Sequence, residues 1–362
     1  MPDSLSEPLL ALQRKAQKFA EFLHSETDAK RMVQASKEAG FFGMTQPAAF
    51  GGAPGSTLEL TIVREALAAA NAPHADLVFG PGPGVLAGCN DRLRKSHLEP
   101  MLAGDLRGSF GFTEPDDAPE PTSAVLEGDN YIVRGQKSYV TGGGSADFIN
   151  TLVRINGESP AMMVIDTSTP GVVLERRFSS LDGSHHAAFR FDDVRVPKHH
   201  LIGEPGDGMP RAMRQIGDTR LAIAASCVGW LLWVTDFTEQ HIRAPDRTGE
   251  PRAAKEGVRL RYSDLRIQTF AARSMLYRTA RLADAGENVV NEAISCKVFS
   301  TEAIGTAVDT AIQLVGGSAL VEGHPLEAMY RRVRALRLAE GASDVLRLNL
   351  VRGNLELGKG RL

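Results

Sequence analysis

The sequence predicts an α+β multidomain protein with an N-terminal all-α domain at 1–107, a central β-barrel or β-sandwich domain at 108–207 and a C-terminal four-helix bundle at 208–362. The length of 362 residues suits two or three domains of roughly 100–200 residues each. Helical periodicity fills the first hundred residues, gives way to short β-rich runs, and then returns until the end. This order differs from the alternating helices and strands of a Rossmann fold.

The N-terminal domain is predicted from two amphipathic segments. Apolar residues recur at three- and four-residue steps over 9–23 and again over 58–72. Glycines and prolines between 40 and 54 break this period, so we expect an ordered loop between the helices.

The two later domains are predicted from a change of period. Short β-rich runs separated by Gly, Asp, Ser and Pro turns predict strands at 131–135, 148–155, 161–167, 171–178 and 187–196. Helical stretches follow near 209–241, 257–285, 288–315, 326–337 and 343–357. Long consecutive helices of this kind favour an antiparallel bundle.

Composition excludes several classes of protein. The net charge of −3 arises from mixed charges, which argues against a nucleic-acid partner. The uncharged apolar stretch at 221–234 falls short of the roughly 20 residues of a membrane span, and the N-terminus has no export signal. We therefore expect a cytoplasmic protein without a membrane span. Cys89, Cys227 and Cys296 are expected to be reduced thiols that form neither disulfides nor a metal site.

Four groups of motifs carry the strongest signal. They are GFTEP at 111–115 with GQKSYVT at 135–141, FDDVRVP at 191–197 with GDG at 206–208, Arg220 at the start of an apolar helix, and QLVGG at 313–317 with Glu340-Gly341. Glu340 follows Gly317 by 23 positions (340 − 317). In order and spacing these motifs resemble the acyl-CoA dehydrogenase family over nearly the whole chain.

The resemblance implies FAD-dependent α,β-dehydrogenation of an acyl thioester, from acyl-CoA to trans-2-enoyl-CoA. Glu340 would be the catalytic base that abstracts the α proton, and flavin N5 would take the β hydride. Burial in an apolar site would raise the pKa of Glu340 toward the range of a general base. Arg220 and Gly341 would lie on the substrate side. Without the resemblance, Glu340 is a helix-terminal acid near a helix capped by Ser343.

The resemblance also assigns residues to the cofactor. The residues that would bind FAD are Phe112, Thr113, Tyr139, Thr141, Arg243, Arg247, Gln313, Gly316 and Gly317. The first four would form the flavin-facing wall, and the last three would meet the adenine and pyrophosphate of a neighbouring subunit's FAD. Taken alone, the threonines and the tyrosine are ordinary strand residues, and the glycine pair is an ordinary helix C-cap.

The chain departs from the family pattern at three places. The segment after TEP is acidic, with Asp116, Asp117 and Glu120 where the family has a glycine-serine-aspartate segment. This segment would repel a CoA phosphate, so an acyl carrier thioester is an alternative substrate. Arg243 and Arg247 are displaced from the family's arginine element, and Ala342 replaces a hydroxyl residue. His185 and His186 are expected to form a solvated turn.

Three functional hypotheses remain open at this point. The first is an acyl-CoA dehydrogenase that passes electrons to an electron-transfer flavoprotein. The second is a subunit of a heteromeric dehydrogenase with an incomplete cofactor site. The third is a flavin oxidase or monooxygenase of the same fold. The resemblance implies a homotetramer, or an α2β2 assembly with a paralogue.

Overall fold

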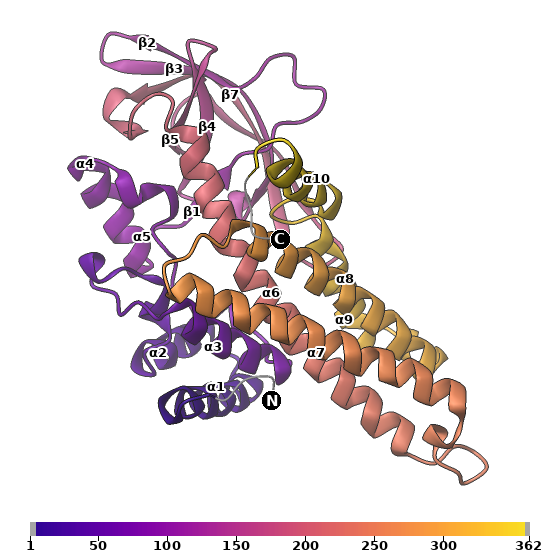
Figure 1. The fold of residues 1–362 in the computed structure, drawn as a ribbon. Coiled ribbons are helices and arrows are strands. Elements are labelled where there is room, and N and C mark those ends of the chain that lie inside the picture. Colours follow the sequence, from indigo (N-terminus) through magenta and orange to yellow (C-terminus); the bar gives the residue numbers. More distant parts are fainter. Residues whose placement is uncertain (1–4, 359–362) are drawn as a thin grey trace. The chain divides into compact units, whose positions relative to one another are not determined.

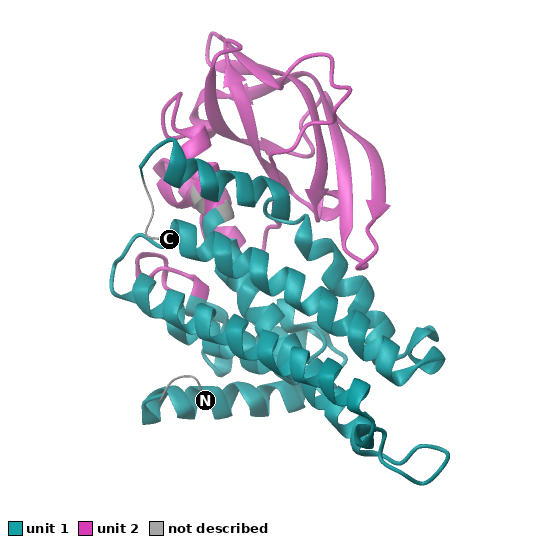
Figure 2. Ribbon diagram, turned by 45° about the vertical axis from the view of Figure 1, so that its right-hand side comes forward, with its two compact units in different colours: residues 1–44, 55–79, 217–362 teal, residues 45–54, 80–216 magenta. Residues whose placement is uncertain are grey.

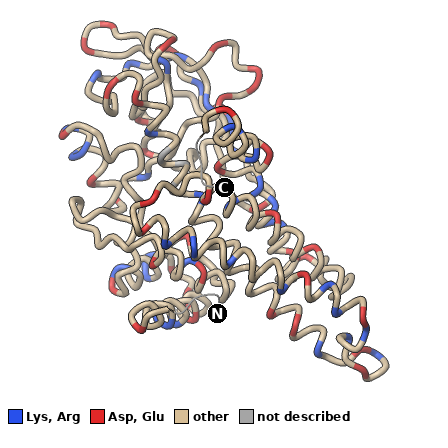
Figure 3. The backbone as a smooth tube through the Cα atoms, viewed as in Figure 1, with Lys and Arg blue, Asp and Glu red and all other residues tan. Residues whose placement is uncertain are grey.

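The chain divides into two compact units of different architecture. The computed structural model describes residues 5–358, except for the side chains of residues 214, 216 and 218. One unit, here the helical unit, comprises Met1–Met44, Gly55–Phe79 and Gly217–Leu362 (Figure 2). The other, the sheet unit, comprises Thr45–Pro54 and Gly80–Ile216. Acidic and basic residues are interspersed along both units (Figure 3).

The N-terminal part of the helical unit contains α1 (Glu7–Ser25), α2 (Ala29–Glu38) and α3 (Thr57–Ala69). The start of α3 is fixed by a capping box, in which Ser56 accepts from the Glu59 backbone N–H and the Glu59 carboxylate accepts from the Ser56 N–H. Between α2 and α3 lie two 3₁₀ turns rather than a plain loop, η1 (Phe42–Thr45) and η2 (Ala48–Phe50).

The C-terminal part is a set of long helices that confirms the predicted bundle. They are α6 (Gly208–Arg243), α7 (Glu256–Asp284), α8 (Val290–Val315), α9 (Pro325–Arg334) and α10 (Ser343–Leu355) (Figure 1). The buried faces of α6, α7, α8 and α9 share one apolar core, to which α6 contributes Val228, Leu231 and Val234. The apolar period read from the sequence is therefore the period of this core.

The N-terminal helices pack directly on the bundle. The Glu65 carboxylate of α3 accepts from Arg273 at 2.7 Å and from the Tyr277 hydroxyl at 2.9 Å, and both donors lie on α7. Glu65 is only 2% exposed, so its negative charge is neutralised inside the unit rather than by water. This buried contact unites helices that are separated by about two hundred residues in the sequence.

The sheet unit is built on one eight-stranded sheet in the order β6-β7-β3-β2-β4-β5-β8, with β1 paired to β4. Its strands are β1 (Gly108–Gly111), β2 (Ser123–Glu127), β3 (Asn130–Thr141), β4 (Phe148–Ile155), β5 (Ser159–Asp166), β6 (Val172–Ser179), β7 (His185–Pro197) and β8 (Leu201–Ile202). Pairing is antiparallel except for β1–β4 and β2–β4, which are parallel. Helical regions with a central sheet confirm the predicted fold class.

The helical segment before the sheet packs on the sheet, although the sequence groups it with the N-terminal helices. It comprises η4 (Gly84–Gly88), α4 (Asp91–Leu93), the π-helical turn η5 (Arg94–Leu98) and α5 (Glu99–Ala103). Leu86 and Leu98 share a core with Phe148 and Met162 of β4 and β5. The boundaries of the two units are thus set by which apolar side chains pack together. The change from helical to strand periodicity along the sequence does not show these boundaries.

Among the described residues, one helical segment is long and apolar enough for a membrane span. This segment, Thr219–Arg243 of α6, has a mean hydropathy of 1.5 in its most apolar window, and half of that window is buried inside the protein. Cys227 and Leu231 of this segment are fully buried in the bundle core. The core helix of a bundle has the same composition, so the segment by itself is weak evidence for a membrane.

Candidate functional site

The sheet unit brings together three of the residues predicted to face the flavin. The backbone N–H of Ser138 donates to the carbonyl of Thr113 at 2.9 Å, so the segment after β1 lies against β3. Farther along, Ser109 donates to the carbonyl of Thr141 at 3.0 Å. Thr113, Tyr139 and Thr141 all have exposed side chains. Two hydroxyls and an aromatic ring are thereby available to a ligand rather than used in the core.

Tyr139 is held outward by an irregular backbone. The pairing of β3 with β7 shifts register between Lys137 and Val140, and Tyr139 has a φ of +52°. A non-glycine residue with positive φ is costly, and bulges of this kind occur where a strand redirects a side chain. The ring of Tyr139 is 61% exposed. A simple strand residue would not need this conformation.

His186 lies on the same surface as Tyr139 and Thr141. The sequence alone did not predict this position. Its Nδ1 lies 3.2 Å from the Thr141 hydroxyl, and its ring stacks on Phe178 with centroids 5.4 Å apart. Phe178 in turn packs edge-on against Tyr139 at 5.2 Å. The expected solvated turn at 185–186 is wrong, because β7 begins at His185. His186 is brought to Thr141 by the pairing of β3 with β7, which only the folded structure shows.

A buried ion pair anchors the segment that carries Phe112 and Thr113. Lys137 is 1% exposed and donates to Glu114 at 2.7 Å and to the carbonyl of Phe112 at 3.3 Å. Glu114 also accepts from the backbone N–H of Thr122 at 2.9 Å. Phe112 is half-buried, and its ring stacks on Phe110. The contacts of Lys137 with Glu114 and with the Phe112 carbonyl thus fix the TEP segment in place.

The helical unit holds Glu340 in a strained turn before α10. Glu340 has a φ of +52° and Gly341 a φ of +106°. A Cβ on Gly341 would lie 2.9 Å from the side chain of Leu346, so glycine is required there by both conformation and space. The N-cap of α10 is Ala342 without a side-chain cap, so the alternative in which Ser343 caps this helix is wrong. The turn is therefore not an ordinary capped helix start.

The charges around Glu340 come from two helices of the bundle. Burial raises the pKa of Glu340, while the positive charges of Arg220 on α6 and Lys297 on α8 lower it. Burial lowers the pKa of Arg220, partly offset by the negative charge of Glu340. Among the described residues, the buried Nε of Arg220 has no hydrogen-bond partner. Glu340 is thus a half-buried carboxylate with a raised pKa, held in a turn of positive φ. These are the properties of a general base.

Arg243 and Arg247 lie at the far end of the same helix from Arg220. Arg243 ends α6 and forms an i,i+4 ion pair with Glu239 at 2.7 Å, and Arg247 is exposed in the following loop. Arg220 and Arg243 are 23 residues apart in one helix, or about 35 Å at 1.5 Å per residue. The structure therefore does not bring these two arginines to Glu340.

Gln313, Gly316 and Gly317 are likewise remote from Glu340. They are exposed at the end of α8, where Gly316 has a φ of +92° and caps the helix. Nothing lies within 4 Å of a Cβ built on either glycine, so their backbone is open to a ligand. Gln313 is 16 residues from Lys297 along α8, or about 24 Å. The glycine pair is a C-cap and an accessible backbone surface at once.

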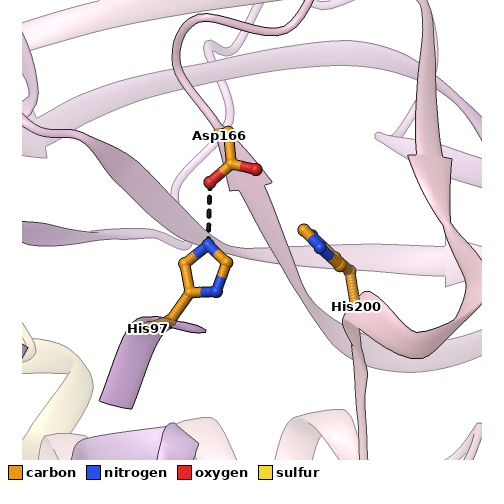
Figure 4. A group of neighbouring side chains, drawn as sticks. All are labelled: His97, Asp166 and His200. Carbon is orange, nitrogen blue, oxygen red and sulfur yellow. Dashed lines mark hydrogen bonds and ion pairs between the residues drawn. The ribbon is translucent and has the colours of Figure 1, made fainter. Parts of the chain in front are cut away.

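A further polar cluster in the sheet unit was not predicted. His97, Asp166 and His200 come from η5, the end of β5 and the turn after β7, and their ligand atoms lie within 4.8 Å of one another (Figure 4). The Nε2 of His97 is 2.8 Å from Asp166, and the Nδ1 of His200 is 3.1 Å from the carbonyl of Val164. No sequence spacing links residues this far apart, so metal-motif reasoning could not find them.

The residues present fit a bound flavin nucleotide. Exposed hydroxyls and an outward aromatic ring suit the edge and face of a flavin, and open glycine backbone at a helix end suits phosphate. A half-buried carboxylate flanked by two cations suits proton transfer at a substrate. Each unit by itself therefore carries groups of the kinds that a flavin-dependent oxidoreductase uses.

Comparison with known proteins identifies the family. Models of the acyl-CoA dehydrogenase N-terminal, middle and C-terminal domains match residues 10–105, 109–194 and 206–355. The chain therefore belongs to the acyl-CoA dehydrogenase family, whose members are FAD-dependent, and its cofactor is FAD.

Individual relatives are similar along most of their length. The probable acyl-CoA dehydrogenase YngJ of Bacillus subtilis is 27% identical, with 87% of each chain covered. The acryloyl-CoA reductase (NADH) of Anaerotignum propionicum is also 27% identical, covering 97% of this chain and 95% of its own. The crystal structure of a probable acyl-CoA dehydrogenase from Mycobacterium abscessus has a TM-score of 0.85 at 29% identity, covering 96% of this chain and 98% of its own.

Proposed function

We propose that the chain catalyses the α,β-dehydrogenation of an acyl thioester, acyl-CoA to trans-2-enoyl-CoA, with Glu340 as the catalytic base. The observation that carries this proposal is the half-buried Glu340 in its strained turn. Burial raises the pKa of its carboxyl group, while the positive charges of Arg220 and Lys297 lower it and so favour the ionised form. Such a balance suits a group that must be ionised to act yet basic enough to take a weakly acidic proton.

The step conserves atoms and electrons. The Glu340 carboxylate takes the α proton, the electrons of the broken α C–H bond form the Cα=Cβ bond, and the β hydrogen leaves with its electron pair. FAD, when bound, supplies the acceptor for this hydride. Gly341 permits the backbone turn that carries Glu340, because its φ of +106° suits glycine. Arg220 supplies positive charge beside the carboxylate.

The test is anaerobic reduction of the bound flavin by a panel of acyl-CoAs. We expect the long-wavelength flavin band of the wild-type protein to bleach, and Glu340→Gln to bleach slower by on the order of 10³-fold or more. Glu356→Gln is the matched control, because Glu356 follows α10 and forms only an exposed ion pair with Arg352. Wild-type flavin that no acyl-CoA reduces would contradict the proposal.

The reverse reaction is the second candidate. The acryloyl-CoA reductase relative aligns with nearly the whole chain, and a protonated Glu340 could donate the α proton to an enoyl thioester. Mixing the pre-reduced protein with a trans-2-enoyl-CoA separates the two directions. Faster flavin reoxidation by the enoyl thioester than flavin reduction by the acyl thioester would favour a reductase.

The electron acceptor is an electron-transfer flavoprotein rather than oxygen. The family resemblance and the retained Glu340 support this assignment. In air, a dehydrogenase produces little hydrogen peroxide per turnover and needs an added acceptor. Stoichiometric peroxide without an acceptor would instead identify an oxidase of the same fold.

The acidic loop decides between CoA and an acyl carrier protein as the thioester's carrier. Asp116, Asp117 and Glu120 are exposed and lie beyond the anchored TEP segment. Because like charges repel, Asp116→Asn/Asp117→Asn should lower the KM for acyl-CoA several-fold at low salt and change it little at high salt. Faster turnover of an acyl carrier thioester by the wild type than by this variant would favour the carrier protein.

The chain acts in an assembly of several copies, as a homotetramer or as α2β2 with a paralogue. Large apolar side chains are exposed on α7 at Ile267 and Phe270, each 64%, and on α10 at Leu348, 71%. The separation of Gln313 and Gly316 from Glu340 supports a role for them at another copy's FAD. Sedimentation of the purified chain gives its state, and Phe270→Arg should shift a homotetramer to smaller species. A wild-type chain that stays monomeric and colourless would favour the paralogue.

A further inference from the structure

Lys297 is a fully buried lysine beside the proposed base. It lies in the N-terminal third of α8 with 0% exposure. Its Nζ donates a hydrogen bond of 2.8 Å to the backbone carbonyl of Gly341. Lysine is almost never fully buried without a strong reason, because its ammonium loses hydration. Because Gly341 directly follows Glu340, this hydrogen bond indicates that the buried lysine supports the turn that carries the proposed base.

The partner of this ammonium is unusual for a buried lysine. Lys137, the other large buried lysine, forms an ion pair with the carboxylate of Glu114. Lys297, in contrast, does not appear in any ion pair within 4.0 Å among the described residues, and its hydrogen bond goes to a carbonyl. Its charge is therefore not cancelled by an adjacent carboxylate and acts on the whole surrounding turn.

Several charged or titratable groups act on Lys297. The pKa of Lys297 is lowered to about 8, chiefly by burial and to a smaller extent by Arg220, against the opposing effects of Cys227, Glu340 and Glu302. The groups that act on Glu340 are Arg220 from α6 and Lys297 from α8. The positive charge of Lys297 on α8 thus lowers the pKa of the proposed base, Glu340.

The turn that Lys297 contacts needs external support. Glu340 and Gly341 both have positive φ, at +52° and +106°. A non-glycine residue keeps such a conformation only where its surroundings fix it. Leu346 packs on one side of Gly341, and the Lys297 ammonium binds the Gly341 carbonyl. Without the Lys297 ammonium, the Gly341 carbonyl loses its hydrogen-bond donor, and the contact that fixes the turn is lost.

We propose that Lys297 is a positioning residue that fixes the Glu340–Gly341 turn through the Gly341 carbonyl and stabilises the ionised form of Glu340 by its charge. The proposal rests on the assignment of Glu340 as the base. It assigns two separable contributions to one side chain, a hydrogen bond that sets geometry and a charge that sets the working pH. Lys297 does not touch the substrate in this role.

The two contributions are separated by two variants. Lys297→Met removes the hydrogen bond and the charge, and Lys297→Gln removes the charge while keeping an N–H donor. Lys198→Met, which removes an exposed lysine from the surface pair with Asp129, is the matched control. The variants are studied as FAD-loaded full chains, and two measurements are made: the rate of anaerobic flavin reduction against pH, and amide hydrogen exchange over residues 338–343.

The expected results differ between the variants. Lys297→Met should exchange faster over 338–343 and reduce its flavin slower by on the order of 10²-fold, because the base is misplaced. In both variants the acid limb of the rate profile should move up by about one pH unit, because Glu340 loses a neighbouring positive charge. Lys297→Gln should retain slow exchange over 338–343. Lys198→Met should match the wild type in every measurement.

A folded Lys297→Met protein with wild-type exchange, rate and acid limb would overturn the proposal. If Lys297→Met does not fold, Lys297→Gln decides, because an unchanged acid limb in that variant removes the electrostatic role. The base assignment fails separately, by an unimpaired Glu340→Gln. In that case faster exchange over 338–343 in a folded Lys297→Met still supports the structural half of the proposal.

Discussion

Gly229 of α6 lies so close to Glu65 of α3 that a Cβ on Gly229 would be 2.4 Å from the Glu65 carbonyl oxygen and 2.5 Å from the Cβ of Ala68. The two helices are therefore in backbone contact at this point. This contact places Glu65 where Arg273 and Tyr277 reach its carboxylate. A single glycine thus allows the N-terminal helices and the bundle to form one helical unit.

We expect Gly229→Ala to destabilise the protein by about 1–3 kcal/mol, because a methyl group at this contact forces the helices apart. Gly257→Ala is the control. Gly257 lies in the first turn of α7 with nothing within 4 Å of a Cβ, so alanine there should be neutral or stabilise by up to about 1 kcal/mol. Urea unfolding of both variants measures the difference. Equal stability of the two would contradict the close approach.

Breaking the Lys137–Glu114 pair should be costly although most surface pairs are not. Lys137→Met leaves the Glu114 carboxylate partly buried without its cation, which we expect to lower the free energy of unfolding by about 3 kcal/mol. Lys198→Met breaks the exposed pair with Asp129, and its effect should stay within about 1 kcal/mol. Thermal and urea unfolding give both values. A small effect at Lys137 would mean that water replaces the ammonium.

The raised pKa of Glu340 predicts opposite pH trends for activity and stability. Flavin reduction should increase with pH through the raised pKa, because only the ionised carboxylate accepts the α proton. The stability contribution of Glu340 has the reverse sign. It is fully present below the unfolded pKa, near 4.5, and is lost as pH rises through the higher folded pKa. The free-energy difference between Glu340→Gln and the wild type should therefore grow in favour of the variant from pH 4.5 upward. A pH-independent difference would show that Glu340 does not titrate as described.

The cluster of His97, Asp166 and His200 is expected to act as a structural tie without a metal. Both nitrogens of His97 are already in contact, Nε2 with Asp166 and Nδ1 with the Ser96 hydroxyl at 2.7 Å, and the Nδ1 of His200 contacts the Val164 carbonyl. EDTA should therefore leave the melting temperature unchanged, and His97→Gln should lower it by removing the contact between η5 and β5. The opposite result, a rise in melting temperature with Zn²⁺ that His200→Gln abolishes, would reveal a cation site.

The same contact gives a second, independent pH signature. The hydrogen bond from His97 lowers the pKa of Asp166 against the opposing effect of burial. Its stabilisation is thus present above the unfolded pKa of about 3.8 and disappears as pH falls through the lower folded value. His97→Gln should flatten the acid limb of the stability curve, and a curve identical to that of the wild type would exclude this coupling.

The sequence by itself determined the secondary structure and the family. Periodicity and turn residues placed α6 to α10 and β4 to β7 within a few residues of their observed bounds, whereas β3 runs to Thr141, six residues past its predicted end. Motif spacing singled out Glu340 and Gly341, and the positive φ values of both show that the turn they occupy is specific. These are local properties, and a linear pattern records them.

Only the tertiary structure decided which distant residues meet. The burial of Lys297 under Gly341, the contact of His186 with Thr141, and the approach of His97 to Asp166 depend on how helices and strands pack. Lys297 reads in the sequence as one charge on an apolar helix, and its role emerges from a carbonyl 44 residues away. Packing, which brings together groups without any fixed sequence spacing, determined the electrostatics of the site, whereas local periodicity determined its scaffold.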